Sequence, residues 1–146
     1  MADWADVFAS VGNYLKVHGW QAGAPVMLPA DTSGADLAGM EFGKIGLPET
    51  VGSLRRRGVK FETVLPDSTP AALVSLTVGF GNEFRVGFAN FHAITRYNRS
   101  HMYASAVSDL ADAIAAASRT GVTPSVPAPA VAEPAVGVPP APPSNP

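Results

Sequence analysis

The chain has 146 residues, a formal net charge of −2 and no cysteine. This length suits one domain, and the near-neutral charge excludes a global electrostatic attraction to nucleic acid or to an anionic membrane. The lack of cysteine excludes a disulfide framework and a cysteine-based zinc site, and no segment of the sequence approaches the length of a transmembrane helix.

Residues 3–18 are predicted to form an amphipathic helix. Apolar side chains recur there at helical spacing, at Trp4, Val7, Phe8, Val11 and Leu15. Asp3 suits the N-cap, and Gly19 suits the residue that ends the helix. Tyr14 lies beside the apolar stripe, at the boundary between the predicted buried and exposed faces.

Residues 21–88 are predicted to form a small β-rich lobe that contains one helix. The helix is expected to begin at Leu47-Pro48-Glu49, with proline in its first turn, and to stop at Gly58. Strand-like runs follow at 59–65, 73–78 and 84–88, and residues 79–83 suit a hairpin loop.

Two further helices are predicted within residues 90–117, at 90–97 and from Ser100 to Ala117. Asn98 breaks the pattern between them, and Ser100 suits the N-cap of the second helix. The predicted fold class is therefore α+β, with helices flanking a β-rich insertion in a folded region of residues 1–120.

The remaining residues, 121–146, carry nine of the fourteen prolines, alternating with alanine and valine. Proline removes backbone donors and fixes φ, so this tail is expected to be disordered, with polyproline II character. It is either a semi-rigid spacer or a tail without a specific role.

The run from Arg96 to Tyr103 is the strongest candidate for a binding site. Tyr97 and Tyr103 each offer a flat apolar ring with a hydroxyl at its rim, and Asn98 offers a donor and an acceptor together. Such groups suit the faces and hydroxyls of sugars. The alternative is that they only pack a helix junction, with Asn98 adopting a left-handed turn.

These residues also carry a family resemblance. Residues 90–107 resemble the C-terminal signature of bacterial, membrane-bound B-type lytic murein transglycosylases, and residues 6–20 resemble a helix of the same family. The resemblance implies a partial lysozyme-like transglycosylase lobe in the periplasm or cell envelope. It implies peptidoglycan glycan strands as the partner and glycan contacts by Tyr14, Tyr97, Asn98 and Tyr103.

The same resemblance implies a chemistry that this chain cannot complete. Family members cleave the MurNAc–GlcNAc bond without water, using one glutamate as acid and then base, and leave a 1,6-anhydro product. That glutamate precedes the helix at which this chain begins, and none of the glutamates present matches it: Glu41, Glu49, Glu62, Glu83 and Glu133. We therefore expect about the last third of such an enzyme, without an export signal, inactive alone and completed by the missing catalytic part.

The remaining polar residues suggest no other chemistry. His18, His92 and His101 lack metal-ligand spacing, so neither a metal nor a cofactor is expected. The arginines 55–57 suit the last turn of the short helix, where cations complement the helix dipole.

A second hypothesis assigns the chain to another functional class. The chain could act alone as a non-catalytic peptidoglycan-binding or interaction module. The fragment hypothesis predicts that Trp4, Phe8 and Val11 form an exposed apolar patch, because the helices that would cover them are absent from this sequence.

Overall fold

The computed structural model describes residues 3–42 and 44–121, so the predicted tail lies, but for Gly121, outside the described residues. The described elements, in chain order, are α1 (Trp4–Val17), β1 (Met27–Ala30), β2 (Glu49–Thr50), α2 (Val51–Arg56), β3 (Pro70–Val78), β4 (Gly81–Gly87), α3 (Ala89–Tyr97) and α4 (His101–Thr120).

The strands form one antiparallel sheet in the order β1-β4-β3-β2. β3 and β4 form the predicted hairpin, although the connection is only two residues long and β4 already begins at Gly81. Gly79 has a φ of 60°, which the first position of such a tight turn requires. Glu83 therefore belongs to β4 and not, as expected, to the loop.

The two faces of β3 bury different clusters, as the period-two alternation of a strand requires. Ala72, Val74 and Leu76 pack with residues of α3 and α4, among them Phe91 and Ala104. Ala71 and Leu73 point to the opposite face and pack with residues of and after α2, namely Val51, Leu54 and Val59. The sheet is thus the central layer between α3 and α4 on one side and α2 on the other.

The packing of α3 on the sheet depends on Gly87. A Cβ atom at this position would lie 2.5 Å from Cδ1 of Phe91, whose side chain is fully buried. The lack of a side chain at Gly87 lets the first turn of α3 lie directly on β4.

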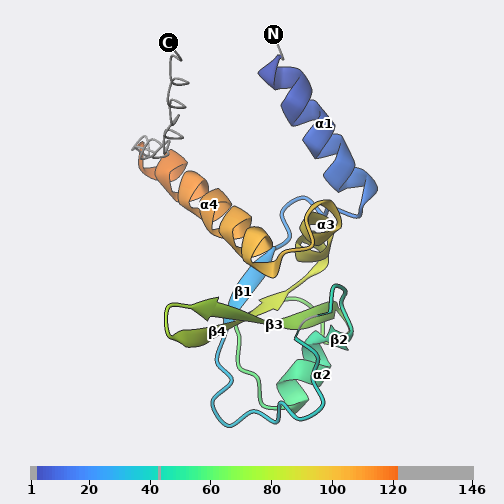
Figure 1. Cartoon of the computed structure of the whole chain (residues 1–146), viewed down its shortest axis with the longest axis vertical. Helices are drawn as coiled ribbons and strands as arrows, with labels where there is room; N and C mark the ends of the chain where they lie inside the picture. Colours follow the sequence, from blue (N-terminus) through green and yellow to red (C-terminus); the bar gives the residue numbers. More distant parts are fainter. Residues whose placement is uncertain (1–2, 43, 122–146) are drawn as a thin grey trace, which may run out of the picture.

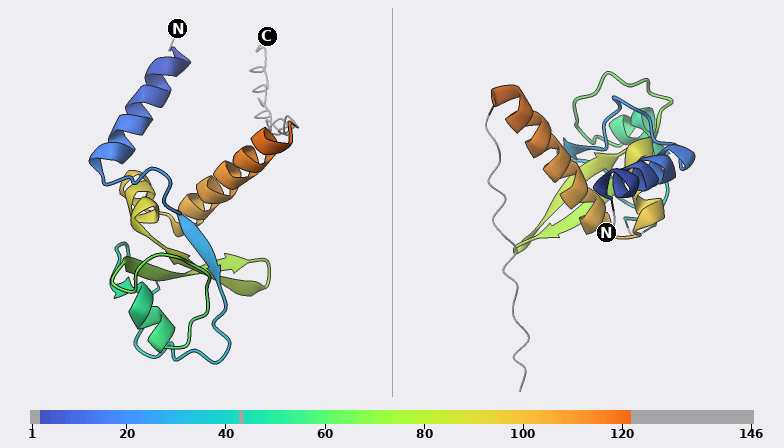
Figure 2. Two further views of the ribbon diagram at one scale, coloured as in Figure 1. Left: turned by 180° about the vertical axis from the view of Figure 1, so that it is seen from behind. Right: turned by 90° about the horizontal axis from the view of Figure 1, so that it is seen from above.

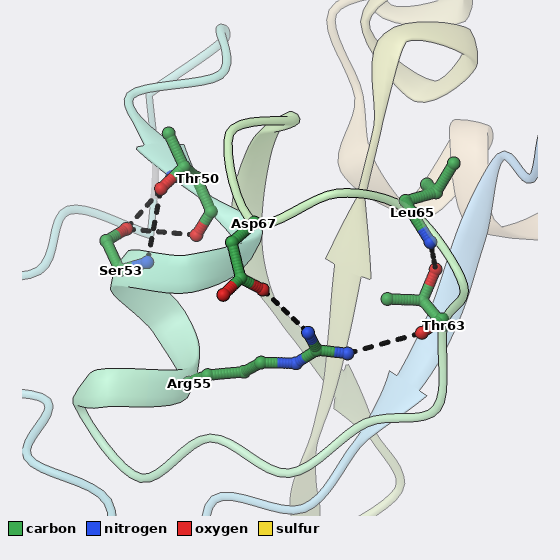
Figure 3. Close-up of polar contacts among 6 residues, drawn as sticks. All are labelled: Thr50, Ser53, Arg55, Thr63, Leu65 and Asp67. Carbon is green, nitrogen blue, oxygen red and sulfur yellow. Dashed lines mark hydrogen bonds and ion pairs between the residues drawn. The ribbon is translucent and has the colours of Figure 1, made fainter.

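α2 begins later than predicted, because a capping box sets its start and Pro48 does not. Thr50 Oγ1 accepts the N–H of Ser53, and Ser53 Oγ accepts the N–H of Thr50, at 3.1 and 2.9 Å (Figure 3). Glu49 lies in β2, and its carboxylate accepts the Ser53 hydroxyl at 2.6 Å, so its predicted place in the first turn of the helix was wrong.

The predicted strand at 59–65 does not form, and only Lys60 pairs with a strand-like residue, Asp31. Pro29 explains this. Asp31 and Lys60 exchange both backbone hydrogen bonds, so in a continued antiparallel ladder the next such pair would join Pro29 to Glu62. Because proline has no N–H, the ladder stops, and Glu62 lies outside any strand.

α1 and α4 rise from the same end of the sheet and spread apart, with α3 between their bases (Figures 1 and 2). The caps agree with prediction, since Asp3 accepts the N–H of Ala5 and Ser100 accepts the N–H of Tyr103. Trp4 and Phe8 on α1 are 73% and 70% exposed. Within the described ranges, no helix combines the length and apolar character that crossing a membrane would need.

Candidate functional site

The predicted site residues Tyr14 and Tyr97 contact each other, although they are far apart in the sequence. Their rings meet edge to face, with centroids 5.5 Å apart and planes at 76°. The Tyr14 hydroxyl donates to the backbone carbonyl of Arg96 at 2.9 Å, and the ring stacks on His18 with centroids 4.0 Å apart. Tyr14 therefore fastens α1 to the end of α3 and fixes one side of the Tyr97 ring.

Two adjoining cavities open beside this pair, and together they are called the tyrosine groove here. The larger, of about 430 Å³, is lined by Asp6, Val7, Ser10, Val11, Tyr14 and Tyr97. The smaller, of about 130 Å³, is lined by Val11, Leu15, Ile94, Tyr97, Tyr103 and Val107. Both share Val11 and Tyr97, so the groove runs from α1 across the end of α3 to α4.

Tyr97 and Tyr103 are the accessible aromatic rings of the groove, at 58% and 39% exposure. Both tyrosines were predicted from the sequence, but Val11, Leu15 and Val107, which line the groove with them, were not. The helical stripe of residues 3–18 marked Val11 and Leu15 only as positions of the predicted buried face. The cavity that they line forms because α1 and α4 meet at α3. The helical spacing of apolar residues predicts which face of a helix is buried but not where two helices meet.

Asn98 has a different place from the tyrosines. It is the C-cap of α3, its Oδ1 accepts the N–H of Ser100 at 3.0 Å, and it is absent from the lining of both cavities. Its φ of −136° is extended, so the left-handed turn considered from the sequence was wrong. Asn98 shapes the junction that separates Tyr97 from Tyr103.

Asn90 is a positioning residue that the sequence analysis missed. Its fully buried side chain accepts the N–H of Gln21 at 2.7 Å and donates to the carbonyls of Gln21 and Ala24 at 2.8 and 2.9 Å. It thereby holds the turn after α1 against α3 and so fixes α1 near Tyr97. A polar residue in the first turn of a predicted apolar helix was the available signal.

The carboxylates of the described residues lie mostly away from the tyrosine groove. Asp6, in the exposed first turn of α1, is the one acidic residue in its lining. Glu41 pairs with Lys44, Glu49 with the Ser53 hydroxyl and Glu83 with Arg85, while Glu62 lines cavities at the edge of the sheet. No glutamate lines the groove, and Glu133 lies outside the described residues.

The histidines contribute packing. The His101 ring lies 5.5 Å from that of Phe91, and burial lowers its pKa. Its Nε2 atom and Nδ1 of His92 are buried without a hydrogen-bond partner among residues 3–42 and 44–121. The same part of the chain contains no group of three or more His, Cys, Asp or Glu side chains that could hold a metal ion.

Comparison with known proteins places this arrangement in a family. The family model described as "Transglycosylase SLT domain" (SLT_2) matches residues 1–112. Membrane-bound lytic murein transglycosylase B of Escherichia coli (strain K12) is 36% identical over 115 residues, which are 79% of this chain and 31% of that protein.

Solved structures agree with the sequence match. Soluble lytic transglycosylase SltB1 from Pseudomonas aeruginosa superimposes with a TM-score of 0.68 and 36% identity, over 83% of this chain and 39% of that one. SltB3 from the same organism, in complex with NAG-NAM-pentapeptide, gives a TM-score of 0.57 and 33% identity over 74% and 29% of the two chains.

The chain spans about a third of the length of these relatives. Their fold confirms the predicted α+β class, with helices flanking a small β-rich lobe in a lysozyme-like transglycosylase architecture. The chain belongs to the SLT_2 family of transglycosylase domains, as its resemblance to B-type lytic murein transglycosylases predicted.

Proposed function

We propose that this chain forms part of the glycan-binding cleft of a peptidoglycan lytic transglycosylase. In this proposal residues 1–120 are the C-terminal part of the catalytic domain and residues 121–146 a separate tail. The rings of Tyr97 and Tyr103 contact the sugars, while Tyr14 and Asn98 set the positions of those two rings. The substrate is a glycan strand that also carries peptides, as in the complex of the relative SltB3.

The observation that carries the proposal is the composition and rigidity of the tyrosine groove. Two partly exposed aromatic rings stand over an apolar floor, and one of them, Tyr97, is packed edge to face against Tyr14, whose hydroxyl donates to the Arg96 carbonyl. Aromatic faces pack on the C–H faces of a pyranose ring, and their rim hydroxyls reach its polar groups. A fixed ring loses little conformational entropy when a sugar binds.

The catalytic acid is proposed to come from the part of the enzyme that lies beyond the matched third. Glycosidic cleavage needs a protonated carboxyl group beside the scissile oxygen, and no glutamate lines the tyrosine groove. In the full enzyme that glutamate would protonate the leaving oxygen as the bond to C1 breaks. It would then take the proton from the O6 hydroxyl, which bonds to C1 and gives the 1,6-anhydro product.

The exposed apolar faces of α1 and α4 favour such a partner over a stand-alone module. Trp4 and Phe8 on α1, and Leu110 and Ile114 on α4, are each at least half exposed. Apolar faces of this kind are normally covered by another part of a protein. The proposed location is the periplasm or cell envelope, where peptidoglycan lies and where the E. coli relative is membrane-bound.

A test with purified peptidoglycan sacculi separates binding from cleavage. The chain should pellet with the sacculi and release no 1,6-anhydro-muropeptides. The double variant Tyr97→Ala/Tyr103→Ala should stay in the supernatant. Phe80→Ala is the matched control, because Phe80 is fully exposed at the β3–β4 turn and lines neither cavity of the groove.

Each result has a distinct meaning. Release of anhydro product by the chain alone would place a catalytic acid among these residues and contradict the proposal. Absence of pelleting, or equal pelleting by the double variant, would remove the glycan-contact role of the tyrosines.

A further inference from the structure

A second groove lies along the outer edge of β1, and none of the four proposed glycan-site residues lines it. It consists of two cavities of about 570 and 470 Å³ between two chain segments, residues 23–31 and 60–65. Glu62 lines both cavities, so they adjoin at this residue, and together they are called the edge groove here. Lys60 and Asp31 close one end of it through their paired backbone hydrogen bonds.

The backbone of β1 faces this groove with groups that the sheet does not use. Phe88 donates its N–H to the carbonyl of Val26 at 3.1 Å. In the register of β1 and β4, the backbone hydrogen bonds between the two strands are therefore made by the even-numbered residues of β1. By the alternation of an antiparallel ladder, Met27 and Pro29 then direct their carbonyls outward, and Met27 also directs its N–H outward. An exposed strand edge of this kind can accept one further extended chain.

The opposite wall of the groove is held in place and does not close onto β1. Arg55 of α2 donates to the Asp67 carboxylate at 2.7 Å and to the Thr63 carbonyl at 3.2 Å (Figure 3). Gly52 of the same helix donates its N–H to the Asp67 carbonyl at 2.8 Å. These contacts hold residues 63–67 toward α2, and the missing N–H of Pro29 removes one of the two backbone hydrogen bonds that would pair β1 with Glu62.

The charges along this wall define what could bind. Lys60 and Glu62 line the same cavity, two residues apart in an extended segment, so both face the groove. Lys60 forms no ion pair within the described part of the chain. Asp31 also lines this cavity, and its carboxylate accepts the N–H of Ser33 at 2.8 Å. The hydrogen bonds from Ser33, and more weakly the charge of Lys60, hold the pKa of that carboxyl below its ordinary value. Lys60 therefore stands at the closed end with no described carboxylate within ion-pair distance, and the carboxylates of Asp31 and Glu62 line the same cavity.

We propose that the edge groove binds an extended peptide that ends in a free carboxylate and carries an amino group two residues earlier. The backbone of the peptide pairs with the outward groups of Met27 and Pro29, its terminal carboxylate meets Lys60, and its amino group meets Glu62. This inference rests on the proposed function, because the peptide would be the one attached to the glycan strand.

The test uses the full chain and a synthetic probe without sugar, acetyl-Ala-Ala-Lys-Ala-Ala, measured by NMR titration against its C-terminal amide. The free acid should bind at the edge groove about tenfold more tightly than the amide, since the amide loses one charge-assisted contact. Lys60→Gln should abolish this difference in affinity, and Glu62→Gln should weaken the binding of both probes. Lys44→Gln, which changes an exposed lysine outside both cavities, is the matched control.

Two results would overturn the inference: equal affinity for acid and amide, or an unchanged preference in Lys60→Gln. Because the probe contains no sugar, the Tyr97→Ala/Tyr103→Ala variant should bind it normally. Conversely, Lys60→Gln should still pellet with sacculi from which the peptides have been removed. Failure of the edge groove is therefore distinguishable from failure of the tyrosine groove.

Discussion

Arg85 on β4 forms a bidentate ion pair with Asp109 on α4. Its Nη1 atom lies 2.5 Å from Asp109 Oδ1 and its Nη2 atom 3.3 Å from Oδ2, while Nε contacts Glu83 at 2.6 Å. These hydrogen bonds raise the pKa of the Arg85 guanidinium, although burial opposes the shift. The contact joins the sheet to the helix that carries Tyr103, so it sets one wall of the tyrosine groove.

Breaking this pair should loosen α4 without unfolding the chain. Asp109→Asn should lower the free energy of unfolding by about 1 kcal/mol, because the arginine is largely buried but the aspartate is half exposed. A double-mutant cycle with Arg85→Met in urea unfolding measures the coupling directly. Zero coupling would show that the contact does not hold α4 on the sheet.

Removing either accessible tyrosine of the groove should weaken glycan binding. We expect Tyr97→Ala and Tyr103→Ala each to cost about 1 kcal/mol in affinity for peptidoglycan fragments, the scale of one lost aromatic contact. Calorimetric titration of each variant checks this value, with Phe80→Ala as the control. Wild-type affinity in both variants would exclude these rings from the binding surface.

Asn90 should be one of the least replaceable polar residues of the fold. Asn90→Ala removes three hydrogen bonds and leaves the backbone groups of Gln21 and Ala24 without their partner. We expect a loss of about 2 to 4 kcal/mol in unfolding free energy, measured by urea denaturation. Asn13→Ala on the exposed face of α1 is the matched control and should change stability by less than about 0.5 kcal/mol. Similar losses in the two variants would contradict the role of Asn90.

Pro29 should be the residue that keeps the edge groove open. Pro29→Val supplies an N–H that can donate to the carbonyl of Glu62, so the predicted strand should extend from Lys60 toward residue 64. Amide hydrogen exchange at residues 62–64 should slow, and the peptide probe should bind more weakly. Pro48→Val, at an exposed position outside every helix and strand, should leave both readouts unchanged. Unaltered exchange in Pro29→Val would mean that Arg55 alone holds the wall away.

His101 should make the fold sensitive to mild acid. Burial lowers its pKa in the folded state below the unfolded value of about 6.5, so the unfolded chain binds the proton more tightly. Its contribution to stability is therefore present above about pH 6.5 and is lost as the pH falls through the lowered folded pKa. Unfolding free energies of the wild type and of His101→Phe, measured from pH 7.5 to 5, test this. The variant should show a flatter dependence, and parallel curves would exclude His101 as the titrating group.

The correct helix predictions rested on strong local signals. The apolar stripe of α1, its Asp3 cap and the Ser100 cap of α4 each depend on residues within one or two turns of each other. One failure had a non-local cause and the other a local cause that the prediction overlooked. The strand expected at 59–65 was lost because its partner segment carries Pro29, and α2 started late because Thr50 and Ser53 form a capping box.

The sequence by itself determined helices α1, α3 and α4, the β3–β4 hairpin, the family and the identity of the tyrosines, because periodicity, caps and motifs are properties of neighbouring residues. Only the tertiary structure decided that Tyr14 fastens α1 to α3 and that Asn98 shapes the junction outside the groove lining. It alone revealed the edge groove beside β1. These features depend on contacts between residues far apart in the chain, whose geometry is set by the packing of the whole core and not by any local pattern.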